Sequence, residues 1–572
     1  MTHRLESLDL GFREQFLDYE ALTTQLRSWA EAFPDVARLT SLGTTPGGRE
    51  LWMLTLGRDP DRLRPALWVD GNMHAVELCG SSVALAFAET LIRLHRGESV
   101  DQPDHITAFL RESLVYVLPR MSPDGAERVL DDGAYVRSVP RDERPHQLHP
   151  HWVSADQDGD GLSLLMRVED PSGEFVASTE VPGLLLPRRI EDSGPFYKVY
   201  PEGVIENFDG HNIPDPDFLS DNQTDLNRNF PWSWAPPHVQ VGAGAHPLSE
   251  VESQAVVAFT TANPHIFGWV NFHTFGGVFI RPHGGKPDNQ MDASDLALYR
   301  QLGAWATELT GYPMVSGFEE FTYTPDTPIR GDVTDFAYHQ LGCVTWACEL
   351  WDLFHQIGIE RKKRFVDHYT HVTRDELIAL GRWDAEHNQG RVVRPWRPFV
   401  HPQLGEVEVG GVDPRFGLWN PPFEQLAELC EQHVAMLLKT LAIAPRLVLE
   451  PPVVEAVSPG TWTVSVTVRN EGYLPTYVLS SAKKLAHNEP LYAVVRASGC
   501  RLADASQTRR EVGHLEGWGR GLFSGDGALY FMRSKGSVSA RTLVWTVRGE
   551  GTLEVAFRSC RTGEVGCTVE VG

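Results

Sequence analysis

Two histidines and two glutamates, each in a short polar stretch next to an apolar run, are the residues of this chain best suited to chemistry. His74 and Glu77 have an HxxE spacing, and His273 and Glu349 follow other apolar runs much later in the chain. Zinc in a hydrolase typically takes three protein ligands, often two His and one Glu, and keeps a fourth position for water. His74, Glu77 and His273 match that count, and we predict that they bind Zn²⁺. The alternative for the first pair is a solvated helix N-terminus, where the helix dipole favours a Glu.

The elements around these residues indicate an α/β fold. The apolar run at 67–70 is typical of a buried parallel strand, and residues 78–95 have helical apolar spacing. Residues 268–272 and 343–349 are also strand-like, and each run carries its polar residue at the strand end. Because open α/β sheets bind ligands beyond the carboxyl ends of their strands, we expect three strand ends to converge on the site.

Glu349 lies in the apolar stretch VTWACELWD. An unpartnered carboxylate is costly to bury, so something must compensate it. A structural ion pair with an arginine is the alternative to a catalytic role.

Four fragments together resemble the zinc carboxypeptidase family, of which pancreatic carboxypeptidase A is the familiar member. They are HAVE at 74–77, DLNRNF at 225–230, NFHTFGG at 271–277 and ACELWD at 347–352. The resemblance extends from near Tyr19 to about Leu441. It implies a mixed, mostly parallel sheet flanked by helices, in a bacterial-type member with an insertion and a C-terminal β domain.

The resemblance also implies roles for the site residues. Glu349 would take a proton from the zinc-bound water and later deliver it to the leaving amine, as general base and then acid. Asn227 and Arg228 match the family's Asn-Arg pair, and a planar guanidinium beside an amide donor suits the free carboxylate of a peptide C-terminus. Arg137 is the expected oxyanion group, with Arg141 and Arg144 as nearby alternatives.

The family carries a Tyr on a mobile loop that closes over the substrate, and here the match is blurred. Tyr323 is the candidate, and Tyr338 is the alternative. Thr334 is the residue expected near the base of the specificity pocket, and it is neither acidic nor large and apolar. Side-chain preference is therefore not readable from the sequence.

Residues from about 140 to 222 form an insertion that is longer than pancreatic members need, and we expect it to border and narrow the cleft. Within it, Asp156, Asp158 and Asp160 of DQDGDG have the spacing of the front half of a calcium loop, which makes Ca²⁺ a second candidate cofactor. The twelfth position is Arg167 rather than Glu, so an ordinary EF-hand is excluded. A tight acidic turn is the alternative.

We expect two domains, a catalytic domain over 1–443 and an accessory domain over 444–572. The second contains short alternating runs, WTVSVTVRN, ALYFMR, RTLVWTV and GTLEVAF, bounded by turn residues. This pattern predicts an antiparallel β-sandwich, and no catalytic constellation is visible in it.

Composition narrows the partners and the location. A formal charge of −25 disfavours nucleic acid, since phosphate binding requires basic patches. The amino-terminal residues carry charge where a secretion signal needs an apolar core, and no run approaches membrane-spanning length. Seven cysteines fit reduced thiols rather than a disulfide framework. We therefore expect a cytoplasmic protein with no membrane partner, and the oligomeric state is not readable.

The sequence thus predicts a zinc carboxypeptidase that acts on peptides with a free C-terminal carboxylate. Relatives with the same zinc ligands process γ-glutamyl, cell-wall or acyl-amino-acid amide bonds, which is the first alternative. A catalytically dead binding protein is a third hypothesis, but neither a zinc ligand nor the base has been lost.

Overall fold

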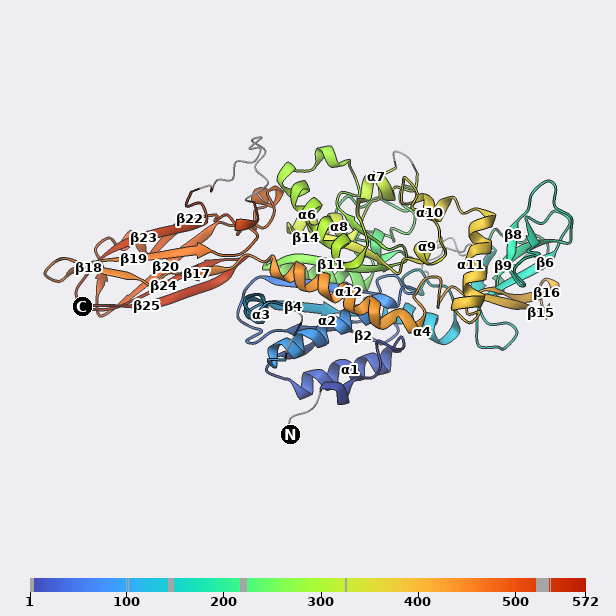
Figure 1. Cartoon of the computed structure of the whole chain (residues 1–572), viewed down its shortest axis with the longest axis horizontal. Helices are drawn as coiled ribbons and strands as arrows, with labels where there is room; N and C mark the ends of the chain where they lie inside the picture. The colour runs from blue at the N-terminus through green and yellow to red at the C-terminus, as the bar shows by residue number, and fades with distance from the viewer. Residues whose placement is uncertain are drawn as a thin grey trace.

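The computed structural model describes residues 5–98, 100, 102–141, 149–216, 224–324, 327–520, 534 and 536–572. Three sheet-containing parts follow one another along the long axis of the molecule (Figure 1). The large α/β part lies in the middle, the C-terminal β domain lies at one end, and a smaller β region lies at the other. The chain therefore places its two additional β regions on opposite sides of the α/β core.

The middle part is built on a mixed sheet with the strand order β1-β2-β4-β3-β11-β14-β12-β13. Neighbouring strands β4, β3, β11 and β14 are parallel, whereas β1, β2 and β12 make antiparallel pairs. This is the mixed, mostly parallel sheet that the sequence predicts. Its strands are β1 (Ala37–Thr44), β2 (Glu50–Leu56), β3 (Ala66–Gly71), β4 (Leu114–Leu118), β11 (Ile266–Thr274), β12 (Val278–Arg281), β13 (Met314–Ser316) and β14 (Val344–Leu350).

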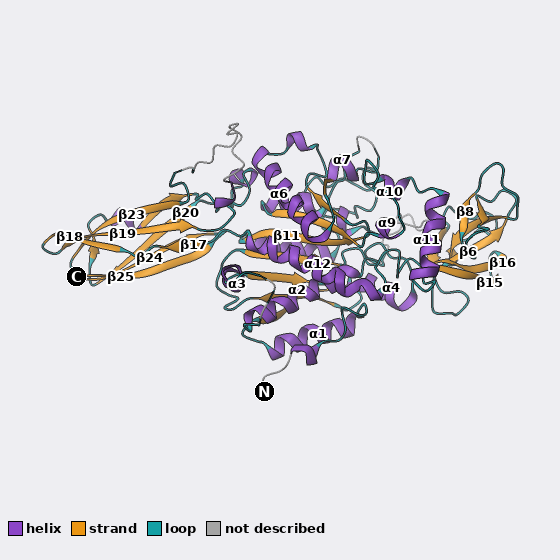
Figure 2. Cartoon of the chain, viewed as in Figure 1, coloured by secondary structure: helices purple, strands orange, loops and turns teal. Residues whose placement is uncertain are grey.

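Helices cover both faces of this sheet (Figure 2). The α-helices of the described part of the chain are α1 (Tyr19–Ala32), α2 (Cys79–His95), α3 (Asp104–Arg111), α4 (Pro123–Asp132), α5 (Val251–Ala262), α6 (Ala293–Thr310), α7 (Gly317–Phe321), α8 (Val333–Phe336), α9 (Leu353–Gln356), α10 (Asp367–Thr370), α11 (Arg374–His387) and α12 (Phe423–Ala442). Of these, α11 packs against the smaller β region rather than the central sheet. Short 3₁₀ and π turns add η1 (Leu5–Leu8), η2 (Leu226–Arg228), η3 (Asp288–Gln290), η4 (Ala337–Leu341), η5 (Ser481–Lys484), η6 (Ala505–Thr508) and η7 (Trp518–Arg520).

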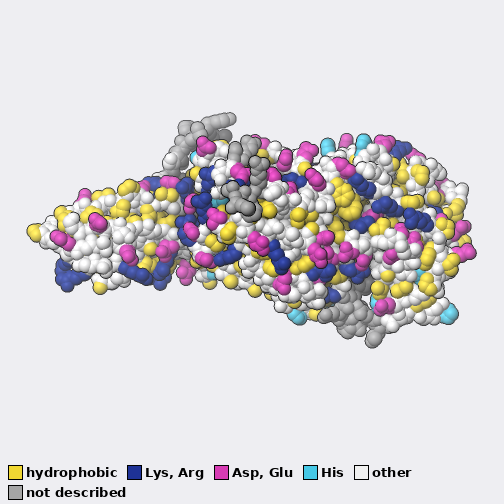
Figure 3. Space-filling view, turned by 90° about the horizontal axis from the view of Figure 1, so that it is seen from below, with side chains coloured by type: hydrophobic (Ala, Val, Ile, Leu, Met, Phe, Trp, Pro, Cys, Tyr) yellow, Lys and Arg dark blue, Asp and Glu magenta, His cyan; other side chains and the backbone are white. Residues whose placement is uncertain are grey.

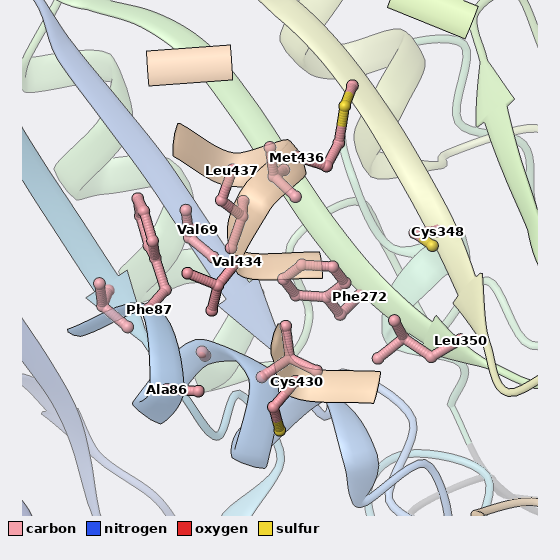
Figure 4. Packing of buried hydrophobic residues seen from close by; sticks show 14 of the residues in the cluster. Val69, Ala86, Phe87, Phe272, Cys348, Leu350, Cys430, Val434, Met436 and Leu437 are labelled. Atoms are coloured by element: carbon pink, nitrogen blue, oxygen red, sulfur yellow. The ribbon is translucent and has the colours of Figure 1, made fainter. Parts of the chain in front are cut away.

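The alternation of side chains along β3 explains how the central strands are buried on both faces. Leu67 and Val69 pack into the core shared with α2 and α12, while Trp68 packs into the core on the opposite face with α5. Strands enclosed in this way need apolar residues at every position, which is why they appear in the sequence as continuous apolar runs. Figure 4 shows residues of α2 and α12, including Phe87 and Val434, against Phe272 of β11.

The insertion does not form its sheet alone. Strand β6 pairs with β9 of the insertion on one side and with β16, from beyond residue 400, on the other. The sheet order is β15-β16-β6-β9-β7-β8, and β5 pairs separately with β10. The strands are β5 (His151–Ser154), β6 (Leu165–Glu169), β7 (Phe175–Ala177), β8 (Leu185–Pro187), β9 (Phe196–Pro201), β10 (Gly203–Glu206), β15 (Val393–His401) and β16 (Gly405–Val412).

Two antiparallel sheets form the C-terminal domain, with the orders β17-β19-β23-β21 and β22-β20-β24-β25. Side chains of both sheets, such as Trp545 and Phe557, share one buried cluster, so the sheets pack face to face as a sandwich. The predicted run ALYFMR lies outside the described residues. The strands are β17 (Leu447–Leu449), β18 (Val453–Ser458), β19 (Thr461–Asn470), β20 (Leu491–Ser498), β21 (Arg501–Leu502), β22 (Arg509–Gly513), β23 (Ala540–Arg548), β24 (Gly551–Ser559) and β25 (Gly563–Val571).

One arginine of the C-terminal domain reaches into the α/β part. Arg561 is 1% exposed and donates hydrogen bonds to the carbonyl oxygens of Pro264 (3.0 Å), Ile266 (2.9 Å) and Leu341. A cavity of about 540 Å³ lies beside this contact and is lined by residues of both domains, including Trp232, His339 and Arg561. The two domains therefore meet through buried polar contacts as well as apolar ones.

Acidic and basic side chains are interspersed over the face seen in Figure 3. None of the helices in the described part of the chain combines the length and apolar composition needed to span a bilayer. All seven cysteines are free thiols, as expected from their number.

Candidate active site

A tight turn between β3 and α2 presents the first two predicted zinc ligands. Asn72, with a positive φ of 55°, donates its side-chain amide to the carbonyl oxygens of His74 (2.9 Å), Ala75 (3.0 Å) and Glu77 (3.2 Å). These bonds fold residues 74–77 into a loop rather than a helical turn. His74 and Glu77 are 3% and 2% exposed, so the solvated helix N-terminus considered from the sequence is wrong.

His273 of β11 completes the cluster. Its Nδ1 lies 3.0 Å from Nδ1 of His74 and 2.9 Å from Oε2 of Glu77, and His74 Nδ1 lies 2.8 Å from Oε1 of Glu77. Ligand atoms at the corners of a tetrahedron around zinc, with bonds of about 2.0–2.1 Å, are about 3.3 Å apart. Three donors of the right types, at nearly that spacing and buried, therefore fit Zn²⁺.

The electrostatics of the cluster suit a cation. Burial opposes ionisation of Glu77, but the His74 and His273 rings lower its pKa to about 2. Burial also lowers the pKa of His273. A carboxylate that stays ionised and an imidazole that stays neutral are the forms in which these side chains bind metals.

Asp225 connects the zinc cluster to the substrate side of the site. Its Oδ1 contacts His74 Nε2 (3.1 Å) and accepts from the Asn227 backbone N–H (2.7 Å), while Oδ2 accepts from Nε of Arg137 (3.1 Å). Burial opposes its charge, but Arg137, His74 and Arg228 hold the pKa of Asp225 well below its usual range. Sequence reasoning quoted Asp225 within DLNRNF without giving it a role. The sequence signal that could have indicated its role is the carboxylate at the first position of that motif.

The structure shows which of the candidate arginines lies beside the His74, Glu77 and His273 cluster. Arg137 NH1 also lies 3.4 Å from Oε1 of Glu77, which places the guanidinium beside the metal cluster. Arg141 instead pairs with Glu250 (2.8 Å) and Glu252 (2.6 Å), away from the predicted zinc ligands. Arg144 lies outside the described residues. Arg137 is therefore the arginine of this segment that is positioned to meet a substrate group at the metal.

Glu349 lies near the end of β14, directly opposite His273 in the parallel ladder. Among the described residues, no hydrogen bond or ion pair to its carboxylate is present, so the structural ion pair considered from the sequence is not made. Burial and the neighbouring Glu77 raise the pKa of Glu349 well above its usual range. Gly276 makes room for this side chain, since a Cβ there would lie 2.4 Å from the Tyr369 hydroxyl and 3.2 Å from Glu349 Cβ.

Asn227 and Arg228 lie in η2, which begins at the Asp225 cap. Asn227 Oδ1 accepts from the backbone N–H of Val333 (2.9 Å), so its amide orientation is fixed by the neighbouring segment. Both side chains are half-buried. Arg228 contributes to the low pKa of Asp225, which places its charge close to the cluster.

Tyr323 is 52% exposed, and the charged groups of the site act on its hydroxyl. Desolvation by surrounding side chains raises its pKa, Arg137 and Arg228 oppose the rise, and Glu349 adds to it. The alternative, Tyr338, is buried and donates to Asp295 (2.8 Å) away from the cluster. Of the two candidate tyrosines, Tyr323 rather than Tyr338 is the one on which the charged groups of the site act.

The polar pair formed by Thr334 and Asp332, next to the segment that contacts Asn227, was not predicted from the sequence. The hydroxyl of Thr334 donates to Asp332 Oδ1 (2.6 Å), so the residue expected at the pocket base is paired with a carboxylate two positions earlier. Asp332 is 5% exposed.

The Asp-rich loop differs from the predicted calcium set. Asp156 and Asp158 group with Glu202, while Asp160 pairs with Arg397 (3.2 Å). Glu202 accepts from the backbone N–H groups of Gln157 (2.6 Å) and Leu164 (2.8 Å). These backbone hydrogen bonds compensate the burial of the Glu202 carboxylate without a metal ion. Calcium binding therefore remains a prediction from the sequence alone.

Residues 22–146 and 215–362 match the family described as zinc carboxypeptidase, and residues 446–570 match a family described as a domain of unknown function. The α/β part of this chain belongs to the zinc carboxypeptidase family, whose members are zinc-dependent hydrolases of peptide substrates.

The curated proteins to which this chain is similar share only a small part of its sequence. Carboxypeptidase A4 of Mus musculus is 22% identical over 326 residues, which is 56% of this chain and 58% of the relative. Carboxypeptidase M of Mus musculus is 26% identical over 152 residues, 26% of this chain and 32% of the relative. The chain thus spans less than two thirds of the length of these relatives.

Solved structures give weak global matches. The crystal structure of thrombin activatable fibrinolysis inhibitor aligns with a TM-score of 0.40 and 17% identity, covering 66% of this chain and 76% of that one. Carboxypeptidase A from Helicoverpa armigera aligns with a TM-score of 0.39 and 15% identity, covering 65% and 72%.

Proposed function

We propose that this protein is a zinc-dependent carboxypeptidase that hydrolyses the C-terminal peptide bond of peptides or proteins. The observation that carries the proposal is the convergence of His74, Glu77 and His273 beside Glu349, whose carboxylate has no hydrogen-bond or ion-pair partner among the described residues. Zinc, when bound to the three ligands, supplies a Lewis acid that polarises the scissile carbonyl and activates water.

The remaining chemistry belongs to side chains of this chain. Glu349 accepts a proton from the attacking water and then delivers it to the leaving amine. Arg137, beside the metal cluster, donates hydrogen bonds to the oxyanion that develops on the carbonyl.

Asn227 and Arg228 hold the free terminal carboxylate of the substrate. The amide orientation of Asn227 is fixed by Val333, so this half of the clamp needs no rearrangement to bind. Tyr323 covers the bound residue from the exposed side. This arrangement disfavours internal bonds, since an amidated terminus leaves the clamp desolvated and unpaired at a cost of about 1–3 kcal/mol.

The test is release of C-terminal residues from a peptide library by the zinc-loaded chain, with zinc content measured on the same preparation. Glu349→Gln should keep its zinc and lose activity. Glu89→Gln serves as the control, because Glu89 is buried in α2 and pairs with Arg93 outside the site (2.8 Å). Equal cleavage of free and amidated peptides would refute the carboxyl-terminal preference.

The same assay separates the alternative substrates. Peptides linked through the γ-carboxylate of glutamate, cell-wall peptides and acyl-amino acids are offered in parallel. Cleavage of one of these classes without cleavage of ordinary peptides would retain the zinc chemistry and replace the proposed substrate. A zinc-loaded chain that cleaves none of them would favour a binding protein.

A further inference from the structure

A second group of metal-binding side chains lies outside the candidate active site. His283 follows β12, Asp335 lies in α8 and His339 lies in the π turn η4. Each residue offers one ligand atom, and these atoms all lie within 4.8 Å of one another. π turns are frequent at functional sites.

The two histidines of this group are spaced like the two histidines of the first cluster. Nδ1 of His283 lies 3.1 Å from Nε2 of His339, compared with 3.0 Å between the Nδ1 atoms of His74 and His273. The ring centroids are 4.7 Å apart in the second pair and 4.6 Å apart in the first. The nitrogen–nitrogen distances of 3.1 Å and 3.0 Å are both close to the tetrahedral edge of about 3.3 Å that zinc–nitrogen bonds of about 2.0–2.1 Å require.

Charge gives an independent reason for a cation at this position. Asp335 is 1% exposed and Asp332, close by in the chain, is 5% exposed. Within the described residues neither carboxylate has a lysine or arginine partner within ion-pair distance, and Asp332 Oδ2 has no hydrogen-bond partner. Buried carboxylates are normally paired or bound to a metal; Lys286 acts on Asp335 without making an ion pair with it, so among the described residues neither carboxylate has a direct counter-charge.

Contacts with neighbouring residues hold two of these side chains in place. Oδ1 of Asp335 accepts from the Gly284 N–H (3.0 Å), and the His339 ring stacks on Trp232 at 4.4 Å. A Cβ on Gly284 would lie 3.2 Å from Asp332 Oδ2 and 3.7 Å from Asp335 Oδ2, so both oxygens face this glycine. His339 also lines the 540 Å³ cavity between the two domains, which offers an entry path.

We propose that His283, Asp335 and His339 bind a second Zn²⁺, separate from the catalytic cluster. Two imidazoles and a carboxylate are a donor set that zinc prefers. The ion would join the end of β12 to α8 and η4. Because Val333 of α8 donates to Asn227, it would also stiffen the segment that orients the substrate clamp.

The test counts zinc in the full chain after dialysis against zinc-free buffer, by inductively coupled plasma mass spectrometry. We expect two zinc ions per wild-type chain, and one in His339→Gln and in Asp335→Asn. His433→Gln is the control and should keep two, since His433 is a buried histidine, at 1% exposure, that belongs to neither cluster. One zinc in the wild type, or two in folded His339→Gln, would overturn the proposal.

The design remains decisive if a variant fails to fold or if the proposed activity is absent. The wild-type count needs no variant, and calorimetric titration of the metal-stripped wild-type chain with zinc should resolve two binding events. His273→Gln should lose the catalytic ion and keep one zinc, which tests the second site without any activity measurement.

A basic substrate side chain is the competing occupant of the two carboxylates. In that case Asp332→Asn would selectively lower kcat/KM for peptides ending in Lys or Arg relative to Leu, while the wild-type chain held a single zinc. That outcome would also overturn the proposal.

Discussion

Replacing Asp225 by Asn tests whether one carboxylate organises both halves of the candidate active site. The change keeps an acceptor for the Asn227 N–H and a partner for His74 Nε2, but it removes the charge and places an NH₂ group against Nε of Arg137. Carboxylates that support a metal-binding histidine change metal affinity or activity about 10- to 100-fold when they are mutated. We therefore expect zinc affinity to fall by about that factor.

A second effect should appear at saturating zinc. A hydrogen bond to a charged group contributes about 1.5–3 kcal/mol, so losing the Arg137 contact should lower kcat/KM about 10- to 150-fold. Zinc affinity is measured by competition with a chromophoric chelator, and kcat/KM with a zinc-saturated peptide assay. Both values are needed, because they separate the support of His74 from the support of Arg137.

Asp124→Asn is the control for this experiment. Asp124 is 6% exposed, compared with 5% for Asp225, and it pairs with Arg49 at 3.1 Å outside the site. It should lose stability without a change in zinc affinity. If Asp225→Asn binds zinc within twofold of the wild type, the reasoning about its connecting role is wrong.

Three further outcomes are expected. Glu349→Gln should lower kcat/KM by about 10²- to 10⁴-fold, the usual contribution of a general base, with zinc content unchanged; loss of zinc would instead make it a ligand. In the metal-stripped chain, burial and the neighbouring Glu77 carboxylate raise the pKa of Glu349 above its usual 4.5, so the Glu349 carboxyl group should take up its proton at a pH above 4.5 as the pH falls; a midpoint at or below 4.5, measured by difference infrared titration of the metal-stripped wild type against Glu349→Gln, would contradict the assignment. Arg561→Ala should unpair several buried carbonyl groups at about 1–3 kcal/mol each and lower the thermal midpoint by several degrees, whereas Arg558→Ala, with a side chain 54% exposed, should not.

Local sequence patterns predicted the elements that bury continuous apolar faces. The run at 67–70 lies in β3, the helical spacing that follows it forms α2, and the strand-like run at 268–272 lies in β11. These elements are readable because each buries a face whose period is fixed by its own geometry. The zinc cluster was foreseen for a related reason, since its residues stand at the ends of such strands.

Long-range pairings account for most of what the sequence did not reveal. Strand β6 pairs with β16 through contacts such as Arg167 with Glu408, which are 241 residues apart in the chain. Glu202 likewise lies beside Asp156, and His339 lies beside His283. These residues are far apart in the sequence, and the periodicity of a single helix or strand carries no information about such contacts. Asp225 was visible within its motif, but its role depends on a contact with His74 that only the folded chain makes.

The pairing of His273 with Glu349 across neighbouring strands has a consequence for how this protein can diverge. Successive side chains of a strand point to opposite faces, so sliding β14 by a single residue would turn Glu349, the proposed base, away from His273. The backbone ladder therefore locks the reactive groups together, while the surrounding loops are free to be lengthened or replaced. Preference for new substrates can in this way be acquired at the rim without disturbing the chemistry beneath it.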